Sequence, residues 1–302
     1  YFDRRDLIVQ LVDHVVETYY PHLTDAPDRA SALMETTVQA SARLLSRWMT
    51  AGFVHGVLNT DNMVVTGESF DYGPWRFLPR NDPNFTAAYF DHQGLYSFGR
   101  QPEAVFWNLQ QLAGCLAQVT DDAGLIAALN TFSDLYREAL RAAMLDRLGV
   151  KSRSAEEDVA LVQAAFVALA AGGESLRWEP FFFDWFCGDE TRALAGPRAD
   201  LYGGEAFLVL ELEHPHGLEE WGGDGRVILA DFPPPAANFV TDGFGVMVFV
   251  FVQAEEQHGG KAAHHDLELQ QQTIAIDPVV DLLQCCGQSA RITRPLSGQS
   301  IS

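Results

Sequence analysis

The most constraining feature of the sequence is a polar segment, HGVLNTDN at residues 55–62, which follows two long helical patterns. Residues 63–70 predict two short apolar strands joined by a turn. Such a hairpin would bring Asp71 back beside Asn62, with Asp61 adjacent. The segment therefore predicts an amide carbonyl and a carboxylate close together, and Mg²⁺ prefers oxygen ligands of this kind.

By itself, an Asn-Thr-Asp-Asn run is typical of a polar turn. The spacing of the whole segment, however, is that of a protein-kinase catalytic loop, H-R-D-L-x-x-x-N followed by D-F-G. On that pattern His55, Asn62 and Asp71 take the His, Asn and D-F-G Asp positions. Val57 takes the position of the kinase base and cannot accept a proton. We therefore expect a metal–nucleotide site without the usual base, and we expect His55 to be structural.

A longer set of words resembles the selenoprotein O family, which consists of kinase-like proteins that transfer AMP to other proteins. The resemblance covers roughly residues 1–210. It is specific as a set, although any one word alone would be weak. The matching words are YYPHL (19–23), HGVLNTDNM (55–63), FDYGPWRFL (70–78) and DHQGLYSFGRQPEAVFWNLQQLA (91–113).

The resemblance implies AMP transfer from ATP to Ser, Thr or Tyr hydroxyls of proteins, with magnesium or manganese as the cofactor. Asp61 matches the proton acceptor, and Asn62 and Asp71 match the metal ligands. Asp71 also matches a residue beside the ATP phosphates. The family's phosphate-holding lysine, its glutamate partner and the glycine-rich loop would lie upstream of Tyr1. The segment given is therefore expected to be a C-lobe fragment that is inactive alone.

Two other functions stay open. The chain could be a true kinase that transfers the γ-phosphate, because phosphoryl transfer depends mainly on positioning and survives the loss of one base. It could also be a non-catalytic pseudokinase module that binds a partner.

Composition limits the partners. The net charge of −21 argues against nucleic acid and anionic membranes. No apolar run approaches the ~20 residues of a membrane helix. The four cysteines, Cys115, Cys187, Cys285 and Cys286, form no C-x-x-C pair, which fits a reducing compartment, and we expect a cytoplasmic protein.

The predicted fold is mainly α (α+β), a kinase-like C-lobe with a short catalytic-loop hairpin followed by an irregular tail. An aromatic-rich stretch at residues 178–185 is expected to pack in the core or between helices. Apolar spacing predicts helices over residues 3–20, 28–50, 102–118, 123–147 and 155–171.

Three polar features near the site are ambiguous. Residues 91–94, Asp-His-Gln-Gly, resemble a metal or acid–base group, but a hydrogen-bonded loop is at least as good an interpretation. Arg76 and Arg80 could meet phosphate, but solvated surface positions are favoured.

Beyond residue 210 the helical periodicity stops, and residues 211–302 form an unassigned tail. It contains a bare β-type run at residues 246–252. The chain has only two lysines, Lys151 and Lys261, against 18 arginines, as GC-rich coding DNA would give. A frameshift near residue 210 or a lineage-specific tail, poorly ordered or not, would explain the change.

Overall fold

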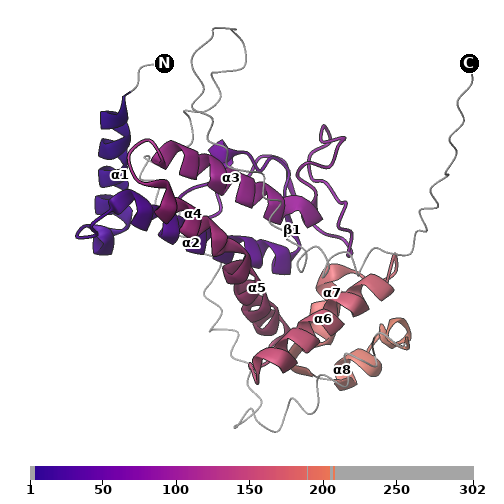
Figure 1. Cartoon of the computed structure of the whole chain (residues 1–302). Helices are drawn as coiled ribbons and strands as arrows, with labels where there is room; N and C mark the ends of the chain where they lie inside the picture. The colour runs from indigo at the N-terminus through magenta and orange to yellow at the C-terminus, as the bar shows by residue number, and fades with distance from the viewer. Residues whose placement is uncertain (1–3, 189, 205–206, 208–302) are drawn as a thin grey trace, which may run out of the picture.

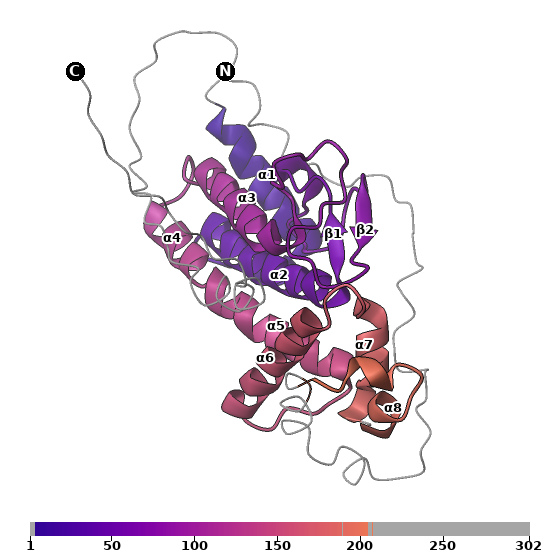
Figure 2. The same cartoon turned by 90° about the vertical axis from the view of Figure 1, so that its right-hand side faces the viewer.

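The computed structural model describes residues 4–188, 190–204 and 207 of the chain. Over these residues the protein is mainly helical, as predicted, and it contains one two-stranded antiparallel sheet. Figure 1 shows α5 running from the group of α1 to α4 toward α6, α7 and α8. In Figure 2 the two strands lie at one side of the helices, with α7 below them.

The first two helices match the predicted ranges closely. They are α1 (Arg5–Tyr19) and α2 (Arg29–Ala51). The Asp28 carboxylate accepts hydrogen bonds from the backbone N–H groups of Ala30 and Ser31 and so begins α2. Gly52 ends it in the left-handed conformation, with φ of 67°.

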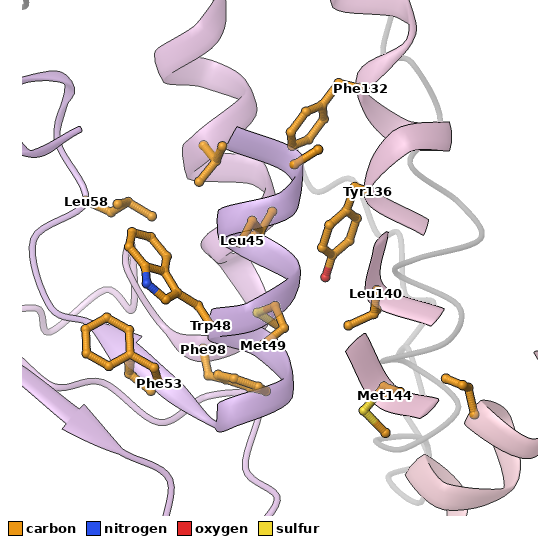
Figure 3. Close-up of a cluster of buried hydrophobic side chains, with 14 of the residues drawn as sticks. Leu45, Trp48, Met49, Phe53, Leu58, Phe98, Phe132, Tyr136, Leu140 and Met144 are labelled. Atoms are coloured by element: carbon orange, nitrogen blue, oxygen red, sulfur yellow. The ribbon is translucent and has the colours of Figure 1, made fainter. Parts of the chain in front are cut away.

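Helix α2 lies at the centre of the core. Figure 3 shows Trp48 and Leu58 on one side of this helix, and Tyr136 and Leu140 of α5 on the other. All four of these side chains are buried. Because α2 is covered on two sides, it holds the candidate catalytic segment, which follows it directly, against the helical core.

The next helices are α3 (Gln101–Leu116), α4 (Asp122–Asn130) and α5 (Phe132–Leu148). The single helix predicted over residues 123–147 was wrong, because the chain breaks it at Thr131. There the backbone N–H and the hydroxyl of Thr131 both donate to the Ala128 carbonyl, three residues back. This tighter turn replaces the regular α-helical bond.

The C-terminal helices are α6 (Ala155–Ala171), α7 (Trp178–Asp184) and α8 (Glu190–Leu194). Most of the aromatic stretch at residues 178–185 packs in the core, as predicted, although Phe183 is 64% exposed. Trp178 is fully buried, its indole N–H donates to the Thr50 carbonyl, and its ring covers Gly52. Helix α7 therefore closes over the C-terminal end of α2.

The sheet pairs β1 (Phe53–His55) with β2 (Trp75–Phe77), with Phe53 opposite Phe77 and His55 opposite Trp75. The sequence did not predict this pairing. Of the predicted hairpin, one antiparallel bridge is present, between Met63 and Ser69. The hairpin is therefore confirmed as a turn of the chain, although its limbs are shorter than expected.

Within the described residues no helix is long and apolar enough to cross a membrane. The tail, including the β-type run at residues 246–252, lies outside the described residues, and the boundary at residue 210 stays a prediction.

A single side chain completes the other edge of β1. Gln101, the first residue of α3, is fully buried. Its Oε1 accepts from the His55 backbone N–H at 2.9 Å, and its Nε2 donates to the Phe53 carbonyl at 3.0 Å. The amide thus takes the place of a third strand, because buried backbone groups need partners.

We predict that Gln101→Leu lowers the free energy of unfolding by about 2–5 kcal/mol, because it leaves two buried backbone groups of β1 without partners. Denaturant unfolding measures the loss. Gln118→Leu, at an exposed position just after α3, is the matched control and should change stability little. A Gln101→Leu protein as stable as the control would contradict this role.

Candidate active site

The β1–β2 ladder closes residues 56–74 into a loop whose two ends are fixed together. Beyond the strands, the Gly56 N–H donates to the Pro74 carbonyl at 2.7 Å. A Cβ at Gly56 would lie 2.1 Å from that oxygen, so only glycine allows the approach. The predicted site residues all lie within this closed loop.

His55 connects the two halves of the loop and is structural, as predicted. Its side chain is 1% exposed, and Nδ1 accepts from the Val57 N–H. Nε2 must then carry the proton, and it lies 3.3 Å from the Phe70 carbonyl. Burial lowers the pKa of His55, and the Phe70 bond and nearby Asp71 oppose that shift. The ring is therefore a neutral link between the catalytic loop and the D-Y-G segment.

Val57, at the kinase base position, contributes only backbone atoms. Its carbonyl accepts from Asn62 Nδ2 at 2.8 Å. This bond uses the nitrogen end of the Asn62 amide and leaves Oδ1, the end that a metal ion would prefer, for another partner. Residues Thr60–Asn62 form one turn of 3-10 helix, and Asp61 in it is exposed.

Asn108 holds the loop from α3 and was not among the predicted site residues. This residue is 1% exposed, and its Nδ2 donates to the Leu58 carbonyl at 3.0 Å. Gln101 and Asn108 are seven residues apart and share one face of α3 with Val105 and Leu112. Two amides on an otherwise apolar face are the signal that would have indicated both residues.

The hairpin after Asn62 packs on the first two helices. The Trp48 indole N–H donates to the Ser69 hydroxyl at 3.1 Å, and the Tyr20 hydroxyl donates to the Val65 carbonyl at 2.7 Å. Met63 pairs with Ser69. Asn62 and Phe70, the next residues outside this bridge, therefore lie at the open end of the hairpin, which is the end away from its turn.

Asp71 follows at this open end in an uncommon backbone conformation. Its φ is 46°, in the left-handed region, and its carbonyl accepts from the Gly73 N–H at 2.8 Å. Asp and Asn adopt this region more readily than other residues with a side chain. Its side chain is exposed. The tight turn at residues 71–73 changes the direction of the chain between Asp71 and β2, which begins at Trp75.

Residues 91–96 attach to the catalytic loop. The Asp91 carboxylate accepts from the backbone N–H groups of Leu95 and Tyr96, both at 2.8 Å. The Tyr96 hydroxyl donates to Asn59 Oδ1. Burial raises the pKa of Tyr96, as do Asp91 and Asp61 nearby. Residues 91–94 are therefore part of a hydrogen-bonded loop, which was one of the two interpretations.

The residues fit a magnesium ion that is shared with phosphate. Asn62 Oδ1 and the exposed Asp71 carboxylate would supply two oxygens, and magnesium usually takes one or two protein ligands beside phosphate and water. The described residues contain no group of three or more His, Cys, Asp and Glu that could hold a metal alone. A site made by the protein and the nucleotide together is consistent with both observations. Arg80 pairs with Glu174 at 2.9 Å, and both side chains are exposed, which fits the favoured surface position.

Residues 1–189 match the model of the family described as protein adenylyltransferase SelO.

The chain belongs to this family.

The predicted resemblance to selenoprotein O is thus confirmed. The chain is 41% identical over 184 residues to the protein nucleotidyltransferase YdiU of Trichormus variabilis, covering 61% of this chain and 38% of that protein. It is 42% identical over 231 residues to that of Trichodesmium erythraeum, covering 73% and 46%. The chain spans less than half the length of these curated relatives.

We predict that the environment of His55 makes stability depend on pH. Burial places the folded-state pKa below the ordinary value of 6.5, so protonation favours the unfolded chain. The contribution is present above pH 6.5 and is lost as pH falls below it. The free energy of unfolding, measured from pH 8 to pH 5, should fall less steeply in His55→Gln. The control His92→Gln, at an exposed position, should keep the original slope. Equal slopes in His55→Gln and the unmodified protein would contradict this prediction.

Proposed function

We propose that this chain carries the metal-binding and acceptor-activating half of a protein adenylyltransferase site. The reaction joins a protein hydroxyl oxygen to the α-phosphorus of ATP, and pyrophosphate leaves. The observation that carries the proposal is the closed loop of residues 56–74, in which Asn62, Asp71 and Asp61 are presented while Val57 offers no base. The names of the relatives support the same class of reaction.

The order of elements supports a kinase-like C-lobe as the scaffold. Two helices, a strand, the polar loop, a hairpin, the D-Y-G segment and a returning strand follow one another as in that lobe. The antiparallel return of β2 to β1 supplies a physical reason for this order, because it brings the two ligand-bearing segments together.

Each residue has a distinct role in the proposal. Asn62 and Asp71 hold magnesium or manganese, which supplies neutralisation of phosphate charge when bound. Asp61 accepts the proton of the attacking hydroxyl. Its exposed carboxylate receives no hydrogen bond from a side chain in the described part of the chain, so it keeps its lone pairs for this task.

Labelled ATP distinguishes this function from its alternatives. The assay uses the natural protein that contains this chain, with magnesium and either α- or γ-labelled ATP. Label on protein from the α position is expected. Label from the γ position alone would instead indicate a kinase, and no label from either would indicate a non-catalytic module.

We predict that Asp71→Asn weakens magnesium-dependent nucleotide binding by at least about 10-fold. Loss even of an outer-shell partner of a metal ligand costs about 10–100-fold, and Asp71 is proposed as a direct ligand. Asn is the appropriate replacement because it tolerates the left-handed backbone at φ of 46°. Calorimetry with magnesium and a non-hydrolysable ATP analogue measures the loss. The exposed Asp121→Asn, just before α4, is the control. Unchanged affinity in Asp71→Asn would remove the metal assignment.

We predict that Asp61→Asn spares nucleotide binding and lowers the rate of AMP transfer by about 10²–10⁴-fold, the usual contribution of a general base. Single-turnover transfer from α-labelled ATP measures the rate, and calorimetry verifies the binding. Transfer at the original rate in this variant would refute the role of Asp61.

A further inference from the structure

Large apolar side chains are exposed beside the candidate site. Most of the exposed aromatic residues of the described chain lie between Tyr72 and Phe90. The three exposed apolar side chains within residues 89–95 are together called the Tyr89 surface: Tyr89 (89% exposed), Phe90 (50%) and Leu95 (47%). The Tyr89 and Phe90 rings lie edge to face, with centroids 5.2 Å apart. An exposed apolar cluster of this kind commonly marks an interaction site.

The chain contacts the catalytic loop on both sides of the Tyr89 surface. Before it, Ala88 is buried, and its backbone nitrogen is 2.9 Å from where a Cβ would stand on Gly56. After it, the Tyr96 hydroxyl donates to Asn59. Gly56 and Asn59 both belong to the loop that contains Asp61. The Tyr89 surface is therefore held next to the proposed base.

The backbone under the Tyr89 surface is fixed by its own hydrogen bonds. Asp91 accepts from the Leu95 and Tyr96 N–H groups, and the Asp91 N–H itself donates to the Ala88 carbonyl at 3.2 Å. The Phe98 N–H donates to the Phe85 carbonyl at 3.0 Å and closes the segment. The exposure of the rings is thus a property of an ordered loop, in which neighbouring apolar residues such as Ala87 and Phe98 are buried.

The charge of the molecule indicates what covers this surface. Asp61 and Asp71 are exposed beside it, and the whole chain has a net charge of −21. Polyanions such as nucleic acids and acidic lipid surfaces are repelled. A polypeptide with a bulky apolar side chain suits uncharged rings in acidic surroundings, and basic residues in it would add attraction.

We infer that the Tyr89 surface binds the acceptor polypeptide and selects a bulky apolar side chain close in sequence to the hydroxyl that is modified. This inference rests on the proposed function and adds a determinant of substrate choice to it. The hydroxyl oxygen bonds to the α-phosphorus, its proton passes to Asp61, and the bond to pyrophosphate breaks. The Tyr89 surface positions the peptide for this step and takes no part in the chemistry.

The test uses synthetic peptides of Lys, Ala and Gly with one Ser, Thr or Tyr acceptor. One position, from five residues before the acceptor to five after it, carries either Phe or Gln. The natural protein that contains this chain is assayed with magnesium and α-labelled ATP. At one or two positions Phe is expected to raise kcat/KM about 10-fold over Gln, within the usual range for a hydrophobic contact in substrate discrimination.

The variant that tests the surface is Tyr89→Gln with Phe90→Gln. It should lose the preference for Phe, so that kcat/KM is the same for the Phe and Gln peptides, while its affinity for magnesium and ATP stays unchanged. Trp107→Gln is the matched control, since Trp107 is a 53% exposed aromatic residue on α3. The control should keep the preference.

The outcomes distinguish a failure of this inference from a failure of the proposed function. AMP transfer without a preference for Phe, or a preference that the double variant retains, overturns the inference and leaves the proposed function standing. A dimer that the double variant converts to monomer, with no peptide preference, assigns the surface to a second copy and also overturns it. Absence of transfer to every peptide and protein, with ATP bound, overturns both.

Discussion

The candidate site depends on satisfying the backbone of one short buried strand, β1. Its three residues are buried, so each N–H and carbonyl needs a partner inside the protein. Strand β2 supplies partners on one edge, and the Gln101 amide supplies them on the other. The first pairing returns the D-Y-G segment to the catalytic loop, and the second attaches that loop to α3. Position of the site and stability of the fold therefore have the same physical origin.

Two amide side chains of α3 hold β1 and the loop that follows it in place. Gln101 bonds to the strand and Asn108 bonds to the loop that follows it. Both are neutral, so neither adds charge beneath the site that is proposed to accept phosphates and a divalent cation. The exposed carboxylates, Asp61 and Asp71, remain at the surface of this frame. The arrangement separates residues that fix geometry from residues that are proposed to do chemistry.

Much of the fold could be predicted from the sequence because local patterns, such as the spacing of apolar residues and the residues that end helices, determine it. Helical spacing and the stop at Gly52 gave α1 and α2 to within a few residues, and the spacing from His55 to Asp71 indicated the site. The β1–β2 pairing could not be predicted, since three-residue strands are too short to show alternation. Gln101 was missed for a related reason: its partners are 46 and 48 residues away. The roles of Asp61, Asn62 and Asp71 stay predictions.

The position of Trp178 has a consequence for how the protein is made. Its ring covers Gly52, where the chain turns from α2 into β1, and its indole N–H bonds to Thr50, 128 residues earlier. A ribosome that adds about 5–20 residues per second needs roughly 6–25 s to make that stretch. During this interval the nascent chain contains residues 55–62 but not yet Trp178, the residue that covers the turn from α2 into β1. The contact of Trp178 with Gly52 and Thr50 can therefore form only well after the residues of the candidate site have been made.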